Sequence, residues 1–271
     1  MNIIGIPALV GTYDNYIWVL HQSQNAWVVD PGESDQVIDF LYKNSLTLKG
    51  ILITHAHHDH VNGIAALKTA FADAIVYGPA DAQTAGVEIG LKEGDQLELT
   101  PNFELKVLET PGHTLDHLAY YNDNALFCGD TLFTAGCGRK FTGSYAQFAD
   151  SILKLRQLDE TTGFYCAHEY TLTNLKFAYL VEPENPALIE RIRTTRIDYP
   201  QIHQGAQSTI AEENATNPFL RFDTPAIKAK LLQRGAVDTS ESLFKTLRLW
   251  KDELDQSGEL DHIDLTSLSV S

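Results

Sequence analysis

The first half of the chain alternates short apolar runs with polar turns, a pattern typical of strands linked by loops. Residues 16–21 and 26–30 are two such runs around a polar stretch, which predicts a β-hairpin. A helical period follows over 35–44, and the apolar run 50–53 predicts a buried strand. We expect a further helix near 63–71. Alternating strands and helices of this kind predict a layered α/β domain.

Three later runs have the length and composition of strands, and each ends at a polar residue. They cover 103–108, 125–128 and 163–167. Binding and catalytic side chains are concentrated on loops that a rigid scaffold holds in place. The ends of these runs are therefore where we expect functional side chains.

The strand signal fades after about residue 172, and helical signals dominate. Pro186 and Pro225 each follow a residue suited to an N-cap, and Thr209 begins a stretch with capping-box spacing. Apolar residues at helical spacing mark faces that must be buried against another surface. They are Leu188, Ile189, Ile192, Leu243, Phe244, Leu247 and Trp250.

This change of pattern predicts two domains, an α/β domain over 1–172 and a smaller α-helical domain over 173–271. A chain of 271 residues with 44% hydrophobic content is long enough for both. One interpretation of the helical part is a cap that only adds stability.

The segment after the apolar run 50–53 is unusually dense in possible metal ligands, with five in six residues. Imidazole and carboxylate groups are the usual ligands for zinc and similar metals. In an extended segment His55 and His57 project to the same side, whereas Asp59 and His60 need a sharp turn to converge. The spacing therefore predicts two adjacent metal sites, with a solvated polar loop as the alternative.

One residue at each of the three later strand ends, together with His55, His57, Asp59 and His60, makes seven candidate ligands. Two four-coordinate ions need eight positions, so one carboxylate must bridge. If Asp130 bridges, the other six divide equally. They are His55, His57 and His113 for one ion, and Asp59, His60 and His168 for the other. A hydroxide bridging two ions about 3.5–4 Å apart, held by Asp130 and Asp59, would then be the nucleophile.

These residues carry a resemblance to the metallo-β-lactamase superfamily, and more closely to the glyoxalase II (hydroxyacylglutathione hydrolase) family. The ligand order indicates only the superfamily, and residues 167–171, 217–221 and 251–252 resemble the narrower family. The resemblance implies an αβ/βα sandwich followed by a helical domain. It also implies a thioesterase that converts S-(2-hydroxyacyl)glutathione, typically S-D-lactoylglutathione, to glutathione and a 2-hydroxy acid, the second step of methylglyoxal detoxification.

The same resemblance implies where the substrate binds. Arg139, Tyr170, Arg248 and Lys251 match positions that hold the glutathione moiety. The expected cofactors are two divalent ions per chain, zinc first, with iron and manganese as alternatives. Asp30 is expected to hydrogen-bond a ligand histidine from outside the coordination shell, although a turn-forming aspartate is an alternative.

The formal charge of −16 argues against nucleic acid as a partner, because binding phosphates requires a basic face. An anionic substrate needs local basic groups that outweigh this charge. The N-terminus has no basic region, and its apolar stretch is broken by Asp14 and Asn15, so we expect no signal peptide and no membrane contact. We expect a cytoplasmic monomer.

The three cysteines are interpreted as reduced packing residues, because their neighbours are apolar and they cannot all pair with one another. A thiolate ligand from Cys128 is the alternative, and Asp130 is the better bridge. His58 matches no ligand position, and His117 is interpreted as an outer-shell or packing residue.

The chain departs from the family pattern at three neighbouring positions. The family more often has an apolar residue in place of Lys140 and glutamate in place of Thr142, and some members have tyrosine in place of Phe141. These departures bear on the detailed contacts to glutathione.

Three other functions would use similar ligands. A lactamase or lactonase would share the ligand set, and a persulfide dioxygenase would bind one iron through His55, His113 and Asp130. A structural metal site is the third alternative, and the shortage of cysteine ligands argues against it.

Overall fold

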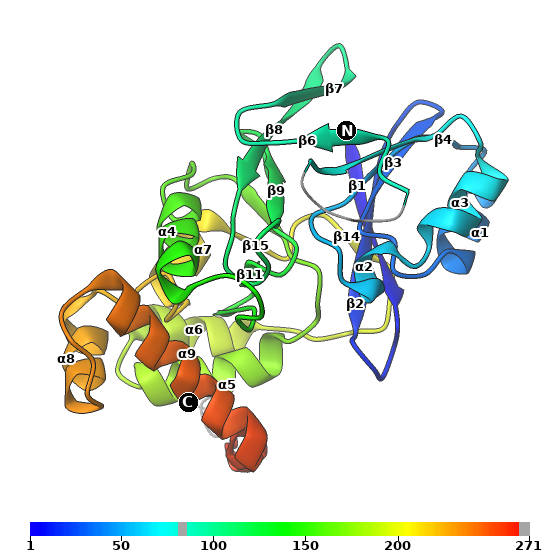
Figure 1. Ribbon diagram of the computed structural model, residues 1–271. Coiled ribbons are helices and arrows are strands. Elements are labelled where there is room, and N and C mark those ends of the chain that lie inside the picture. The colour runs from blue at the N-terminus through cyan, green and yellow to red at the C-terminus, as the bar shows by residue number, and fades with distance from the viewer. Residues whose placement is uncertain (81–85, 266–271) are drawn as a thin grey trace.

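The computed structural model describes residues 1–80 and 86–265. Two mixed β-sheets face each other, and helices cover the outer face of each (Figure 1). The seven-stranded sheet consists, in spatial order, of β14 (His203–Gln204), β1 (Asn2–Ala8), β2 (Asn15–Gln22), β3 (Asn25–Val29), β4 (Thr47–Leu52), β5 (Ile75–Pro79) and β6 (Ile89–Leu91). The predicted hairpin is confirmed, because β2 and β3 pair antiparallel from Trp18–Val29 to Gln22–Asn25.

The second sheet has six strands. In spatial order they are β15 (Ser208–Thr209), β13 (Gly163–Tyr165), β10 (Ala125–Phe127), β9 (Leu118–Tyr121), β8 (Phe103–Glu109) and β7 (Gln96–Thr100). A small ribbon is formed by β11 (Leu132–Phe133) and β12 (Gly136–Cys137). Both β14 and β15 come from the C-terminal part of the chain and extend one edge of each sheet, although we expected helices to dominate there.

The helices are α1 (Asp35–Lys43), α2 (His58–Val61), α3 (Ile64–Ala70), α4 (Tyr145–Leu155), α5 (Thr171–Val181), α6 (Pro186–Thr194), α7 (Ile210–Thr216), α8 (Pro225–Gln233) and α9 (Ser240–Ser257), with a 3-10 turn η1 (Glu259–His262). The predicted N-cap of α6 is confirmed, since Asn185 accepts from two backbone N–H groups. Thr209 caps α7, whereas Thr224 precedes α8 without a side-chain cap bond. Within the described ranges, no helix is both long enough and apolar enough to cross a membrane.

Buried side chains fill the spaces between the layers. Trp18 and Leu52 of the first sheet pack with Tyr120 of the second. On the other face of the first sheet, Val19 packs with Leu41 of α1 and with apolar side chains of α3. This order of helix, sheet, sheet and helix confirms the αβ/βα sandwich.

A further apolar cluster lies outside the second sheet and joins it to the C-terminal helices. Phe164 of β13 and Phe148 of α4 belong to the same cluster as Phe244 of α9. Phe219, from the loop before α8, is also part of it. Phe148 and Phe244 lie 5.0 Å apart between ring centroids. The C-terminal helices are therefore packed on the sandwich through a shared core, and they cover the end of it where the candidate ligands lie.

Candidate metal centre and active-site cavity

The loop after β4 is anchored before the ligands begin. Thr54 donates its backbone N–H and its hydroxyl to the two carboxylate oxygens of Asp30, each at 2.7 Å. The backbone of His57 is extended, and α2 then supplies the turn that brings Asp59 and His60 back towards the same space. This turn is the one that the spacing of these residues required.

The first group of candidate ligands consists of three imidazoles and one carboxylate. Nδ1 of His57 lies 3.0 Å from Nε2 of His55 and 3.0 Å from Nε2 of His113. Nδ1 of His113 donates to the backbone carbonyl of Arg139 at 2.7 Å, which leaves the Nε2 lone pair free to bind a metal. Candidate ligand atoms of these three residues and Asp130 all lie within 4.8 Å of one another.

The second group consists of Asp59, His60 and His168, and Asp130 lies between the two groups. Oδ2 of Asp59 is 3.3 Å from Nε2 of His60 and 3.6 Å from Nε2 of His168. Oδ1 of Asp130 faces this group, at 3.1 Å from Nε2 of His168 and 3.4 Å from Nε2 of His60. Its Oδ2 faces the first group, at 3.4 Å from Nε2 of His113.

The chemistry of these groups fits divalent metal ions. Nε2 of His60 and Oδ1 of Asp130 are buried without a hydrogen-bond partner in the part of the chain that is described, as expected of atoms that bind a metal. Burial holds the pKa of His55 well below its usual range, so its ring is neutral. Burial opposes ionisation of Asp130, but His168 and His60 outweigh it and hold its pKa well below the usual range. Neutral imidazoles and an ionised carboxylate are the forms that bind metals.

Asp30 lies where the sequence predicted an outer-shell partner. Its Oδ2 is 3.1 Å from Nδ1 of His60, which orients the opposite ring nitrogen towards Asp130. His117 is also buried close to the centre. It stacks on His55 with ring centroids 4.8 Å apart, and its Nε2 accepts the backbone N–H of Asp130 at 3.1 Å. Both residues therefore position ligands and are not themselves in either group.

Two other residues near the centre are not part of either ligand group. The side chain of His58 is 60% exposed and packs edge-on against Tyr13. The thiol of Cys128 lies 3.2 Å from the carbonyl of Leu132. All three cysteines are free and buried, which confirms that they are unpaired.

Close backbone packing holds the ligand loops together at Gly138. A Cβ at this position would lie 2.0 Å from the backbone oxygen of Asp130 and 3.0 Å from Nδ1 of His113. Only glycine fits there without moving the two ligand loops apart.

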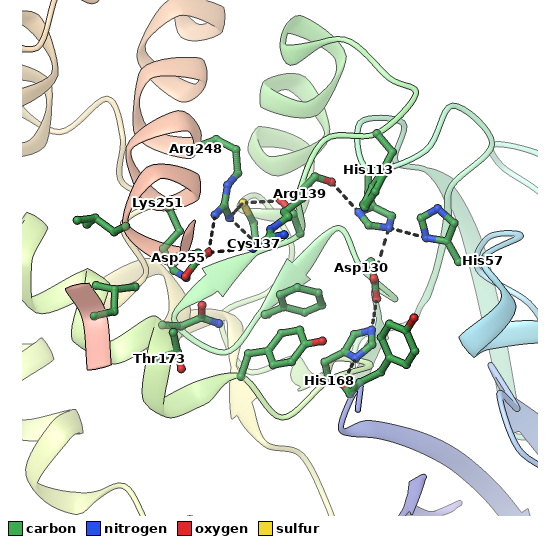
Figure 2. A pocket seen from close by; sticks show the side chains of 18 of the residues that line it. His57, His113, Asp130, Cys137, Arg139, His168, Thr173, Arg248, Lys251 and Asp255 are labelled. Carbon is green, nitrogen blue, oxygen red and sulfur yellow. Dashed lines mark hydrogen bonds and ion pairs between the residues drawn. The ribbon is translucent and has the colours of Figure 1, made fainter. Parts of the chain in front are cut away.

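A cavity of about 510 Å³ extends from the metal groups to α9 (Figure 2). Tyr170 lines it and stacks face-on against His168, with ring centroids 4.9 Å apart. Phe141 also lines it, is 56% exposed, and meets His57 and His113 edge-on at 5.0 Å each. The two groups of candidate ligands therefore face an open cavity that is lined by aromatic side chains.

The far part of the cavity holds the three predicted basic residues, and each is paired with a carboxylate. Arg248 lies 3.1 Å from Asp252, and Nζ of Lys251 lies 2.5 Å from Asp255. Arg139, whose side chain is 57% exposed, lies 3.7 Å from both aspartates. Asp255 was not among the predicted residues, although its spacing of four residues from Lys251 on a helix could have indicated the pair.

Comparisons with known proteins agree with this arrangement. Residues 10–168 match the family model of the metallo-beta-lactamase superfamily, which is the class of protein that the fold and the His/Asp groups define. Residues 169–254 match the model described as hydroxyacylglutathione hydrolase C-terminus. A hydroxyacylglutathione hydrolase from Hydrogenovibrio crunogenus is 43% identical over 268 residues, 96% of this chain and 98% of the relative. One from Photobacterium profundum is 44% identical, over 93% of this chain and 99% of the relative. The chain therefore belongs to the hydroxyacylglutathione hydrolase family of metal-dependent hydrolases.

Solved structures show the same fold at lower identity. ETHE1 from Myxococcus xanthus has a TM-score of 0.61 at 21% identity, covering 91% of this chain and 97% of that one. The BLEG-1 B3 metallo-beta-lactamase has a TM-score of 0.57 at 23% identity, covering 80% of this chain and 98% of that one. The fold and the His/Asp groups together indicate that the protein binds divalent metal ions.

Proposed function

We propose that the protein hydrolyses S-(2-hydroxyacyl)glutathione, typically S-D-lactoylglutathione, to glutathione and a 2-hydroxy acid, the second step of methylglyoxal detoxification. The observation that carries this proposal is a single cavity that joins two His/Asp groups to three cationic side chains. Relatives named hydroxyacylglutathione hydrolase over nearly the whole chain support it.

We propose two ions per chain, one held by each group, with Asp130 shared between them. Zinc suits a set of imidazole and carboxylate ligands, and iron and manganese accept the same donors. Bound divalent ions would lower the pKa of water and offset the negative charge that develops on the thioester carbonyl oxygen.

The chain's own residues orient this centre and do not supply a nucleophile. His113 and His168 each donate Nδ1–H to a backbone carbonyl, at 2.7 Å from Arg139 and Tyr13 respectively, which fixes both rings. Burial raises the pKa of the Cys137 thiol to about 12, so that cysteine is protonated at neutral pH and a poor nucleophile. The leaving group is a thiolate of ordinary thiol pKa, so it needs no strong general acid.

The basic groups explain how a chain of charge −16 binds an anionic substrate. Arg139, Arg248 and Lys251 line the cavity away from the metal groups, and we assign them to the carboxylates of the glutathione moiety. Tyr170 is assigned to the substrate as well, because it lines the cavity and stacks on His168.

We propose that metal binding and substrate binding are carried out mainly by different parts of the chain. All seven candidate ligands and Arg139 lie within 1–172, the metal-binding catalytic domain. Arg248 and Lys251 lie within 173–271, the helical substrate-binding domain, and α9 carries both.

The proposal is tested by assaying the purified, metal-loaded protein with four substrates in parallel. These are S-D-lactoylglutathione, a β-lactam, a lactone and glutathione persulfide. We expect the thioester to have the highest kcat/KM by at least about a hundredfold, since only it can use both ends of the cavity. Preference for any of the other three would contradict the proposal.

A further inference from the structure

The second group of candidate ligands contains two histidines that are held from outside the group. Asp30 faces Nδ1 of His60 at 3.1 Å, and the carbonyl of Tyr13 accepts from Nδ1 of His168 at 2.7 Å. The third member, Asp59, is a carboxylate and has no second ring nitrogen to anchor it. Carboxylates that bind metals are themselves held by hydrogen bonds from neighbouring residues. A donor to Asp59 is therefore expected nearby.

Asn15, the first residue of β2, supplies that donor. It is only 1% exposed, and its Nδ2 lies 3.1 Å from the backbone oxygen of Asp59 and 3.3 Å from Oδ2 of the same residue. An amide nitrogen carries two hydrogens, so it can donate to both oxygens at once. Among the residues that the structure describes, Asn15 is the only one outside the two ligand groups that donates to this carboxylate. The side-chain torsion of Asp59 is thereby fixed.

The orientation of the Asn15 amide is dictated by Asp59. If the amide were turned over, Oδ1 would face two acceptors, so only the present orientation is favourable. In this orientation Oδ1 of Asn15 is buried and has no hydrogen-bond partner within 1–80 and 86–265. A buried acceptor without a partner costs free energy. A purely structural asparagine would be expected to use both ends of its amide, whereas Asn15 uses only the end that faces a candidate ligand.

The backbone of Asn15 is tied to another member of the same group. Asn15 pairs antiparallel with His168 in an isolated β-bridge, and beside it the N–H of Glu169 donates to the carbonyl of Asp14 at 2.9 Å. Asn15 therefore joins Asp59 of α2 to the loop after β13, which carries His168. These backbone contacts do not need the amide, so a substitution at this position tests the side chain alone.

We propose that Asn15 is a positioning residue for the second metal ion, because its amide holds the carboxylate of Asp59 towards His60 and His168. This assignment rests on the proposed two-ion centre. Asn15 does not line the cavity, so it acts through Asp59 and not on the substrate. Its side chain contacts no member of the first group. Loss of the amide should therefore weaken the binding of one ion and spare the other.

Zinc binding by the metal-free protein tests this. Titration in the presence of a chromophoric chelator that competes for zinc gives the affinity of each site. We expect Asn15→Ala to lower the affinity of one site by about ten- to a hundredfold, as for loss of an outer-shell partner, and to leave the other within about threefold.

Asn214→Ala is the matched control. Nδ2 of Asn214, on α7, also donates to a backbone carbonyl, that of Arg156, and its Oδ1 is likewise buried without a partner in the described part of the chain. Asn214 contacts no candidate ligand, so Asn214→Ala should keep both zinc affinities of the wild type.

The Asp59→Ala background separates positioning from a general structural role. In that background Asn15→Ala has no carboxylate to release, so the affinity for the remaining ion should change by less than about twofold. Equal losses at both sites, unchanged affinities in Asn15→Ala, or a further loss in the Asp59→Ala background would each overturn the proposal. Asn15→Leu fills the same space without a donor, and it decides the question if Asn15→Ala does not fold, as judged by circular dichroism. A wild type that binds a single zinc ion would instead overturn the two-ion centre, and this proposal with it.

Discussion

Oδ1 of Asp130 lies 3.1 Å from Nε2 of His168. Its second oxygen, Oδ2, lies 3.4 Å from Nε2 of His113, in the other group of candidate ligands. One buried carboxylate therefore faces both groups, and a change at this residue should affect metal binding by both.

We predict that Asp130→Ala lowers metal content at both groups, because this one carboxylate faces each of them. Metal analysis of the purified variant should give well under one ion per chain under conditions that saturate the wild type. Asp150→Ala is the control, since that carboxylate is exposed on α4. Retention of one full ion by Asp130→Ala would show that the carboxylate serves only one group.

Substitution of two neighbouring histidines in the ligand loop should lower the activity to very different extents. His57→Ala removes a nitrogen that lies 3.0 Å from two other candidate ligands, so we expect kcat/KM to fall by at least about a hundredfold. His58 is 60% exposed, and His58→Ala should stay within about threefold of the wild type. Thioester hydrolysis at equal folded and metal-loaded concentration measures both. Similar losses in the two variants would place His57 outside the metal centre.

Replacing both Arg248 and Lys251 with alanine should raise KM for S-D-lactoylglutathione about tenfold or more, with kcat nearly unchanged. Charged hydrogen bonds to the ligand are worth roughly 1.5–3 kcal/mol each. In the free protein Arg248 and Lys251 are paired with Asp252 and Asp255, and weakening these pairs offsets part of the binding free energy.

Steady-state kinetics on the glutathione thioester and on a short thioester without glutathione measure this effect. Lys245→Ala is the matched control, because Lys245 lies on the same helix and is exposed. The double variant should not differ from the wild type on the short thioester. An unchanged KM for the glutathione thioester would remove the basis for assigning α9 to substrate binding.

The candidate metal centre could be predicted in detail because most of its residues can be recognised from their types and their short spacing in the sequence. The candidate ligands His55, His57, Asp59 and His60 are close in sequence, and strand ends bring the remaining three to the same edge. The division into two groups around Asp130 needed only a count of coordination positions, and the structure places the side chains in that same division.

Other features depend on contacts that the sequence does not show. The strands β14 and β15 have two residues each, too few to display a period, and they form only because a sheet edge is available. The pairing of Arg139 with two aspartates of α9 depends on how that helix packs against the cavity. The role of His117 behind His55 likewise depends on a loop arrangement that a single histidine does not predict.

Stability should depend on a buried ion pair behind β11 and β12. Glu213 is fully buried, lies 2.5 Å from Arg191, and accepts the backbone N–H of Ala135 at 2.9 Å. Glu213→Ala removes the carboxylate closest to the buried Arg191, whose remaining carboxylate neighbour, Glu212, lies 3.7 Å away, so we expect a loss of about 3 kcal/mol in the free energy of unfolding. Urea denaturation measures it. The control Glu212→Ala changes a neighbour whose side chain is 44% exposed, and should cost about 1 kcal/mol or less. Equal losses in the two variants would be inconsistent with this role.

We expect hydrolysis of a glutathione thioester to require two metal ions per chain. This requirement is tested most directly by removing metal with a chelator, adding zinc back in steps, and measuring bound zinc and S-D-lactoylglutathione hydrolysis on the same samples. We predict no activity without metal and full activity only as occupancy approaches two ions per chain. Full activity at one ion, or activity that persists without metal, would show that the protein is not a two-metal hydrolase.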